Sequence, residues 1–448
     1  MKFKFSILRL LILLPAVVLS ACTGIVPYQV DLLPTPDVYA KKIVNPFPSE
    51  DMIKALPYKG ILYVTDRLPS SKKHDEIYYR NKRGGFLRLG VGAVEIDRQK
   101  WFVNKETQWE ELVKISTTKK RKQNYPLQVK GLKEIGILDR SGNVFKSIPK
   151  SIKNPRLPAQ EYAKLINKQL ASSRKKDVFI YVHGYNTIFE DPLLVGAELW
   201  HYIGYDGVFI AYAWPATPRG FAYLADMDTA RVTSRNLRFF LEYLSEETDV
   251  ENIHIIGYSM GTRVVSYALE DIALMYKGQK SSKIREKVKV GNVMLIGSDL
   301  EIAVFGGYLL DGILNTTKSL TVYSSNNDSA MSASSWLFER PRLGESWTNR
   351  EVPKSLKDYL EQNKKLRLID VTLAENADVG NGHHYFIESP WVSSDVLLTL
   401  GYNLSPQQRG LALNKETNMW YFSKDYPKRV AAELRKIDPK ILNVHAGK

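Results

Sequence analysis

The residues Gly257-Tyr-Ser-Met-Gly261 place a serine between two glycines in the pattern G-x-S-x-G. A short apolar run over 252–256 precedes this motif, and apolar residues at helical spacing follow it over 264–269. In such a strand–turn–helix setting Ser259 would lie on a sharp turn with its hydroxyl exposed, where it could act as a nucleophile. The alternative is a glycine-rich turn whose serine only caps the following helix.

A serine hydroxyl is a poor nucleophile at neutral pH and needs a base to take its proton. In the arrangement that a nucleophilic elbow predicts, an acid and then a histidine follow the serine along the chain. Only His383, His384 and His445 follow Ser259, and His445 lies close to the C-terminus, where fraying is expected. His383 and His384 stand in a glycine- and asparagine-bearing loop after the last clear strand, where the base is expected. Their spacing alone does not decide between them.

Two aspartates could orient that histidine. Asp328 closes the apolar run at 320–323, and Asp299 closes the run at 289–296. Chain order favours Asp328 and leaves Asp299 as its competitor. An aspartate at the end of a strand is also a common turn or helix cap without any chemical role.

Acyl transfer also needs two donors for the oxygen of the tetrahedral intermediate. The first is expected to be the backbone N–H of Met260, directly after the serine, and the second the N–H of Tyr185 in His183-Gly-Tyr-Asn186. The sequence has no H-E-x-x-H motif and one cysteine only, so we expect neither a metal nor a cofactor.

The elements that would position these groups alternate regularly in the second half of the chain. Helical spacing is found at 160–170, 190–203 and 226–246, and apolar strand-like runs at 177–182, 208–213, 252–256, 289–296, 320–323 and 366–371. This alternation predicts a mostly parallel sheet with helices on both faces. Each candidate residue follows the end of a strand, which is where ligands bind in such sheets.

The start of the chain has the features of an export signal. Three basic residues precede an apolar run at 10–18, and Leu19-Ser-Ala-Cys22 follows. This ending resembles the lipobox of bacterial lipoproteins, which implies that residues 1–21 are removed and that Cys22 is acylated, for example with palmitate. The resemblance, with Thr23 after the cysteine, implies an outer-membrane lipoprotein facing the periplasm. The proline-rich residues 22–57 are expected to form an extended tether to the lipid.

The formal net charge of +15 would suit an anionic membrane surface or a nucleic acid. The basic residues are dispersed, with short runs at 119–122 and 174–176, and no nucleic-acid-binding motif accompanies them. Together with the predicted export, this argues against a nucleic-acid partner.

Seven short segments together resemble a bacterial α/β-hydrolase family of unknown function within the esterase/lipase superfamily. The segments are Val64-Thr-Asp-Arg67, Val182-His-Gly-Tyr-Asn186, Ala213-Trp-Pro215, Ile256-Gly-Tyr-Ser-Met-Gly261, Ser298-Asp299, Tyr323-Ser-Ser-Asn-Asn-Asp328 and Gly382-His-His-Tyr-Phe386. They span about 60–400, so the resemblance includes the β-rich start. The last segment resembles a family Gly-His-Ser-Tyr-Phe, which implies His383 as the base and puts His384 at the serine position.

We therefore expect an α/β-hydrolase fold with a β-rich N-terminal part at 58–158, a core at 159–404 and a C-terminal tail at 405–448. The expected function is hydrolysis of an ester or a related acyl bond of a small substrate by Ser259, His383 and Asp328. The alternative is a non-catalytic envelope lipoprotein that uses the same fold as a binding surface. The segment 216–226, with Phe221 and Tyr223, could form a small flap or an ordinary surface loop.

Overall fold

The computed structural model describes residues 29–437 and 442, except 48, 72, 75, 97–107, 143, 151, 220–221 and 348–350. The predicted signal peptide, Cys22 and Phe221 therefore lie outside the described residues. Within the described ranges, no helix combines the length and the apolar character needed to cross a membrane.

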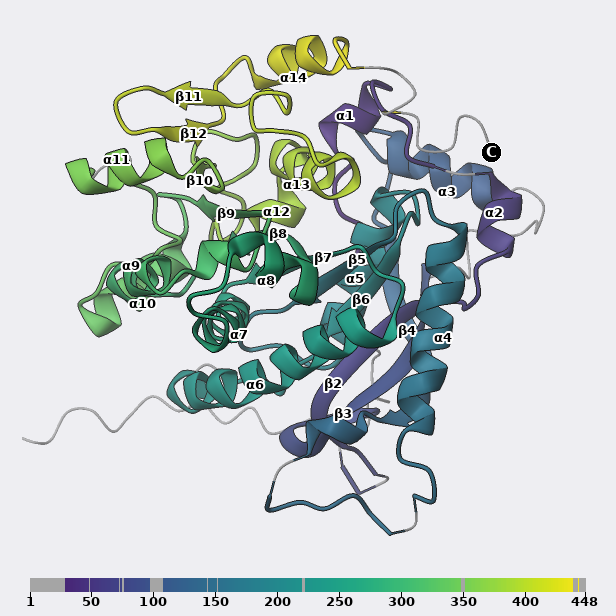
Figure 1. Cartoon of the computed structure of the whole chain (residues 1–448). Coiled ribbons are helices and arrows are strands. Elements are labelled where there is room, and N and C mark those ends of the chain that lie inside the picture. Colours follow the sequence, from purple (N-terminus) through teal and green to yellow (C-terminus); the bar gives the residue numbers. More distant parts are fainter. Residues whose placement is uncertain are drawn as a thin grey trace, which may run out of the picture.

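One twisted sheet runs through the described part of the chain (Figure 1). Its strands follow the order β1-β4-β3-β2-β6-β5-β7-β8-β9-β10-β12-β11. From β2 to β12 neighbouring strands are parallel, and the pairs at the two ends of the sheet are antiparallel. The bounds are β1 Gln29–Asp31, β2 Ile61–Pro69, β3 Tyr79–Ile96, β4 Pro126–Ile137, β5 Asp177–Val182, β6 Val208–Tyr212, β7 Asn252–Tyr258, β8 Val290–Ile296, β9 Ser319–Ser324, β10 Leu366–Asp370, β11 Ala412–Asn414 and β12 Met419–Tyr421.

The central strands are rich in apolar residues and fully buried because both of their faces are covered. Every residue of β5, β6, β8 and β9 is buried, as expected for parallel strands between two helical layers. The sequence prediction of a mostly parallel sheet agrees with this arrangement. In the β-rich N-terminal part, residues 126–137 form one long strand, β4, which pairs with the even longer β3.

Helices cover both faces of the sheet. On one face α4, α6 and α7 pack together, with α6 and α7 running side by side in Figure 1. On the other face α5 packs against β2 to β6 and contacts α3 and the N-terminal segment, while α13 contacts α1. The bounds are α1 Asp37–Ala40, α2 Glu50–Lys54, α3 Gln108–Thr117, α4 Leu157–Ser172, α5 Glu190–Tyr202, α6 Tyr223–Glu247, α7 Gly261–Met275, α8 Ser281–Val288, α9 Ile302–Leu310, α10 Ser329–Phe338, α11 Lys354–Gln362, α12 Tyr385–Glu388, α13 Pro390–Tyr402 and α14 Tyr426–Leu434.

The tether predicted for residues 22–57 is wrong from residue 29 onward. The backbone N–H of Leu33 donates to Glu198 Oε1 at 2.8 Å, and the hydroxyl of Tyr39 donates to the carbonyl of Tyr202 at 2.6 Å. The prolines suggested an extended spacer, but the apolar side chains among them are buried on the face of the sheet that α5 covers. This segment is part of the folded body.

Residues after 404 extend the sheet and do not form a separate tail. Strand β12 pairs in parallel with β10, and α14 packs beside α1. Arg409 is fully buried, and its guanidinium donates to both carboxylate oxygens of Asp395 on α13, at 2.7 and 3.2 Å. Tyr323 on β9 donates to the same carboxylate at 2.7 Å. The buried ion pair thus fastens the C-terminal residues to the core.

Candidate active site

Ser259 lies on a sharp turn between β7 and α7. Its φ is +51°, in the left-handed region that costs a non-glycine residue about 1–3 kcal/mol. The turn is held by backbone hydrogen bonds, because the N–H of Ser259 donates to the carbonyl of Ile296 at 2.9 Å and its carbonyl accepts from Thr262. A strained serine held from both sides between a strand and a helix has the geometry of a nucleophile elbow.

Two glycines allow the close packing around this turn. A Cβ at position 261 would lie 2.3 Å from the carbonyl oxygen of His183, so only glycine lets α7 begin this close to the end of β5. A Cβ at position 184 would lie 2.9 Å from Ser259 Cβ. The loop after β5 therefore passes directly over the serine.

His383 and Asp328 form a hydrogen-bonded pair beside the serine. Nδ1 of His383 lies 2.7 Å from Oδ2 of Asp328, and both side chains are buried. The other carboxylate oxygen, Oδ1, accepts the N–H of Met331 at 3.0 Å and so caps α10. With Nδ1 held by the carboxylate, Nε2 is the nitrogen that can exchange a proton with a substrate or a nucleophile.

No hydrogen bond joins Ser259 Oγ to His383 among the described contacts, although both residues line the same cavity. Such a contact is often long in the absence of substrate and shortens when substrate binds.

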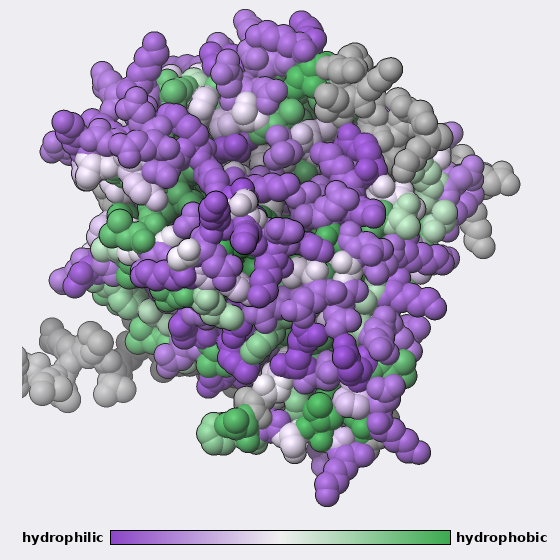
Figure 2. All heavy atoms as spheres, viewed as in Figure 1, coloured by the Kyte–Doolittle hydropathy of each residue, from purple (hydrophilic) through white to green (hydrophobic). Residues whose placement is uncertain are grey.

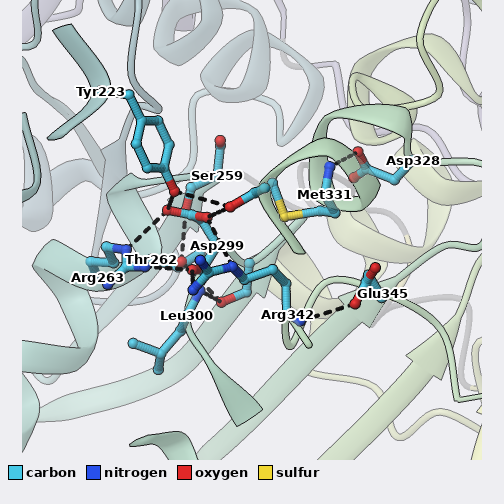
Figure 3. A network of polar contacts seen from close by, with 12 residues as sticks. Tyr223, Ser259, Thr262, Arg263, Asp299, Leu300, Asp328, Met331, Arg342 and Glu345 are labelled. Atoms are coloured by element: carbon cyan, nitrogen blue, oxygen red, sulfur yellow. Dashed lines mark hydrogen bonds and ion pairs between the residues drawn. The ribbon is translucent and has the colours of Figure 1, made fainter. Parts of the chain in front are cut away.

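Asp299 is occupied by a different network (Figure 3). Its carboxylate accepts from Arg263 Nε at 2.9 Å and from the hydroxyls of Tyr223 and Ser334 at 2.5 and 2.8 Å. Asp299 makes no hydrogen bond with His383 in the described part of the chain. Of the two aspartates left open by the sequence, the structure therefore brings Asp328 to the histidine and joins Asp299 to a buried arginine.

His384 also lines this cavity, and part of the residue is exposed to solvent while its ring is partly desolvated by the cavity wall. Desolvation in the cavity wall and the neighbouring His383 lower the pKa of His384. It contacts Tyr258 and His383 through its ring, with no hydrogen bond among the described residues. Of the two histidines, only His383 therefore carries a carboxylate partner.

The loop after β5 is fixed by a mutual contact between His183 and Trp214. The indole N–H of Trp214 donates to the carbonyl of His183 at 2.6 Å, and the two rings stack at 5.3 Å. The ring nitrogens of His183 face the carbonyls of Gly184 and Trp214, at 2.7 and 3.0 Å. Burial, aided by the charge of Arg67, lowers the pKa of His183 to about 3, so the ring is neutral and donates to only one carbonyl. This contact holds in place the backbone that leads to Tyr185.

The two predicted oxyanion donors flank the serine. Met260 stands at the N-terminus of α7, where backbone N–H groups are free of intrahelical partners and the helix dipole favours negative charge. Tyr185 follows Gly184 on the loop that passes over Ser259. Met260 is thus the next residue after the serine, and Tyr185 is the next residue after the glycine that lies against it.

Ser259, His383 and Tyr185 line one cavity of about 380 Å³ at the carboxyl ends of the parallel strands. The cavity wall is rich in aromatic and apolar side chains, with Asp191, Asn186 and Asn381 among its polar groups. Among the described residues no cluster of three or more His, Cys, Asp or Glu side chains could hold a metal ion.

The sequence also matches the model of a known protein family. The model of the family described as "Alpha/beta hydrolase of unknown function (DUF900)" covers residues 159–400. The chain belongs to this family. No curated protein sequence matches the chain. The resemblance read from the sequence motifs is confirmed for residues 159–400, and the fold of an α/β hydrolase accounts for the order in which the candidate site residues occur.

Two residues of this α/β hydrolase support the site without having been singled out in the sequence. Arg67 is fully buried and donates to the carbonyl of Thr187, in the loop after β5, at 2.9 Å, and to the side chain of Asn81. The hydroxyl of Tyr385 accepts from the N–H of Gly297 at 2.6 Å and donates to the carbonyl of Tyr323 at 3.0 Å. Both residues lie in the motifs that carry the family resemblance, and this was the signal that could have revealed them.

Residues 223–226 of the segment considered as a flap belong to α6. Tyr223 is held by its hydrogen bond to Asp299 and lies edge-on to Tyr185 with ring centroids 5.3 Å apart. It forms a fixed wall of the cavity in this structure.

Proposed function

We propose that this α/β hydrolase is a serine hydrolase that cleaves an ester or a related acyl bond through an acyl-enzyme. The observation that carries the proposal is the convergence of a strained elbow serine with a buried His383–Asp328 pair at one cavity. A fold alone would not support an activity. A nucleophile, a base and an orienting acid that lie together do support one.

In the proposed reaction, Ser259 Oγ attacks the carbonyl carbon while its proton passes to Nε2 of His383. Asp328 stabilises the imidazolium, and the N–H groups of Met260 and Tyr185 bind the oxyanion. His383 then returns the proton to the departing alcohol as the acyl–oxygen bond breaks. A water molecule attacks the acyl-serine by the same route and releases the acid.

The size of the cavity limits the substrate. A volume of about 380 Å³ lies at the lower end of ordinary small-molecule sites, about 300–1,000 Å³. A small acyl group fits this site, and a large polymer would have to present one end to it.

Labelling with a fluorophosphonate probe tests this proposal directly. The wild-type protein should be labelled, and Ser259→Ala and His383→Ala should not. His384→Ala is the matched control, because its side chain lies in the same loop without a carboxylate partner, and it should be labelled like the wild type. A folded wild-type protein that is not labelled would contradict the proposal and favour a non-catalytic lipoprotein that binds through this fold.

We also propose that Cys22 carries the lipid that anchors the mature protein to the outer membrane, on the periplasmic side. The support is the placement of the chain's only cysteine directly behind a charged and apolar leader. Metabolic labelling with palmitate should modify the wild-type chain and not Cys22→Ser. Unlabelled wild-type protein in the soluble fraction would contradict the anchor.

A further inference from the structure

Two neighbouring helices, α9 and α10, expose apolar surface that a soluble helix normally turns inward. Neither helix contains a charged residue. A surface helix usually has a polar outer face, yet Leu310 is 85% exposed and Trp336 82% exposed. In α9 only Phe305 is buried, and a Cβ at Gly306 or Gly307 would meet nothing within 4 Å. The outer side of this helix is therefore uncovered.

Two contacts link α9, α10 and the first turn of α6 to one another. An isolated bridge between Glu301 and Arg342 joins the start of α9 to the segment after α10. The rings of Tyr223 and Phe338 lie 5.7 Å apart and join the start of α6 to the end of α10. Figure 2 shows green and pale side chains gathered over α9 and α10 at the left of the view. The surface, called here the α9–α10 surface, consists of Leu224, Val304, Leu310, Trp336 and Leu337.

The α9–α10 surface lies on the outer side of the walls of the catalytic cavity. Tyr223 precedes Leu224, and Ala330, Met331 and Ser334 line the cavity from the same helix that exposes Trp336. Asp328 caps the start of that helix. Whatever covers this surface therefore contacts a helix that also forms part of the cavity wall.

The chemistry of the surface fits a lipid bilayer. Tryptophan combines a large apolar ring with one N–H donor and favours the boundary between lipid and water. Helix α9, at nine residues, is far too short to span a bilayer and could only lie along it. Ion pairs, Arg340 with Glu301 and Lys277 with Asp311, flank the apolar helices. The full chain carries a net charge of +15, and +12 remains without the three basic residues of 1–21, which attracts the mature protein to an anionic surface.

We propose that the α9–α10 surface docks on an anionic lipid bilayer and holds the cavity at the membrane–water boundary. Trp336 and Leu337 enter the interface, and the basic protein is attracted by anionic headgroups. That the substrate is an acyl ester dissolved in this bilayer rests on the proposed function. The docking itself does not.

Flotation with vesicles tests the docking, using equal parts of phosphatidylcholine and phosphatidylglycerol. The chain from residue 23 removes the predicted lipid and keeps every residue that the structure describes. It should float with these vesicles. The double variant Trp336→Ser/Leu337→Ser should bind the vesicles at least about tenfold more weakly. Binding should fall with salt and with vesicles of phosphatidylcholine alone.

The matched control is Val144→Ser/Phe145→Ser, because these side chains are 94% and 92% exposed in a loop between β4 and α4. It should float like the unmodified chain. Both double variants should unfold at the same temperature as the unmodified chain and hydrolyse a short soluble ester at the same rate. Loss of floating in the control, or equal floating of all three proteins, would overturn the proposal.

Two further measurements distinguish docking from catalysis and from dimer formation. Ser259→Ala should float like the unmodified chain while losing hydrolysis, so a failed esterase assay would leave the docking result intact. A chain that forms dimers in solution and becomes monomeric through Trp336→Ser/Leu337→Ser, without binding vesicles, would overturn the proposal in favour of a second copy as the occupant.

Discussion

Asp328 uses its two carboxylate oxygens for two different tasks. Oδ2 lies 2.7 Å from Nδ1 of His383, and Oδ1 accepts the N–H of Met331 at 3.0 Å as the cap of α10. The cap fixes the carboxylate, and the carboxylate fixes the imidazole. The orientation of the proposed base therefore depends on the start of a helix that also forms a wall of the cavity.

Asp328→Asn should separate these tasks. Asparagine caps helices about as well as aspartate, so the melting temperature should change little. It would stabilise the wrong tautomer of His383 and would not stabilise the imidazolium, and kcat should fall by about 10³–10⁴-fold. Ester hydrolysis and thermal unfolding of the purified variant measure the two effects.

Asp299→Asn is the comparison for that variant. It leaves Arg263 buried opposite a neutral side chain, which should lower the free energy of unfolding by about 3–5 kcal/mol. If Asp299→Asn removed activity without loss of stability while Asp328→Asn remained active, the assignment of the acid would be wrong.

Gly184→Ala should disturb the serine directly. The new methyl group would lie 2.9 Å from Ser259 Cβ and 3.5 Å from its Oγ, so either the serine or the loop after β5 must move. A displacement of about 1 Å at a reacting group can cost about 10²-fold in rate, and fluorophosphonate labelling should slow by a factor of this order.

Gly196→Ala is the control for this substitution. At that helical position the new methyl group would meet Phe209 and Ala211 at 3.5 to 3.7 Å, which is ordinary contact. Alanine favours a helix over glycine by about 1 kcal/mol, so stability should be kept or raised and labelling should be unchanged. Equal labelling rates for the two variants would show that the loop does not press on the serine.

The core strands could be predicted from the sequence because their burial depends on local composition. The runs that became β5, β6 and β8 are mostly apolar, as is typical of parallel strands between two helical layers. The N-terminal segment could not be predicted in the same way. Its Leu33 and Tyr39 are held by Glu198 and Tyr202, which lie far along the chain on α5.

The candidate site shows the same division. The position of Ser259 follows from a local pattern, since glycine, serine and a change of apolar period all fall within a few residues. The choice between Asp299 and Asp328 does not follow from a local pattern. It depends on the hydrogen bond from Arg263, on α7, to Asp299, in the segment after β8. No spacing in the sequence reports that contact, and only chain order pointed to Asp328.

The Arg409–Asp395 pair predicts how the C-terminal residues contribute to stability. Arg409→Met should leave the carboxylate of Asp395 buried without its cation and lower the free energy of unfolding by about 3–5 kcal/mol. Adding Asp395→Asn removes the charge and keeps an oxygen for the hydroxyl of Tyr323, so the double variant should regain part of the loss. Urea unfolding of the three proteins measures this. A double variant less stable than Arg409→Met would show that the charge of Asp395 is satisfied without the arginine.

Glu198 should make the protein less stable as the pH rises. Burial raises the pKa of Glu198 to about 8 from its ordinary value of 4.5, although the N–H of Leu33 and the charge of Arg121 oppose the shift. Between these two values the folded protein binds a proton that the unfolded chain has lost. The free energy of unfolding therefore falls with rising pH across this window, by up to about 1.4 kcal/mol per unit.

Glu198→Gln should remove this dependence, because glutamine can accept the N–H of Leu33 and carries no proton to lose. The buried His183 and His201, whose pKa values burial lowers to about 3, act in the opposite sense below about pH 6.5. Both proteins contain these histidines, so their contribution cancels when the free energies of unfolding of the variant and the wild type are subtracted. Urea unfolding at pH 5 and pH 8 should show the variant gaining on the wild type at the higher pH, whereas the exposed Glu111→Gln should not. Parallel curves for the wild type and Glu198→Gln would mean that the carboxyl of Glu198 ionises as easily in the folded protein as in the unfolded chain.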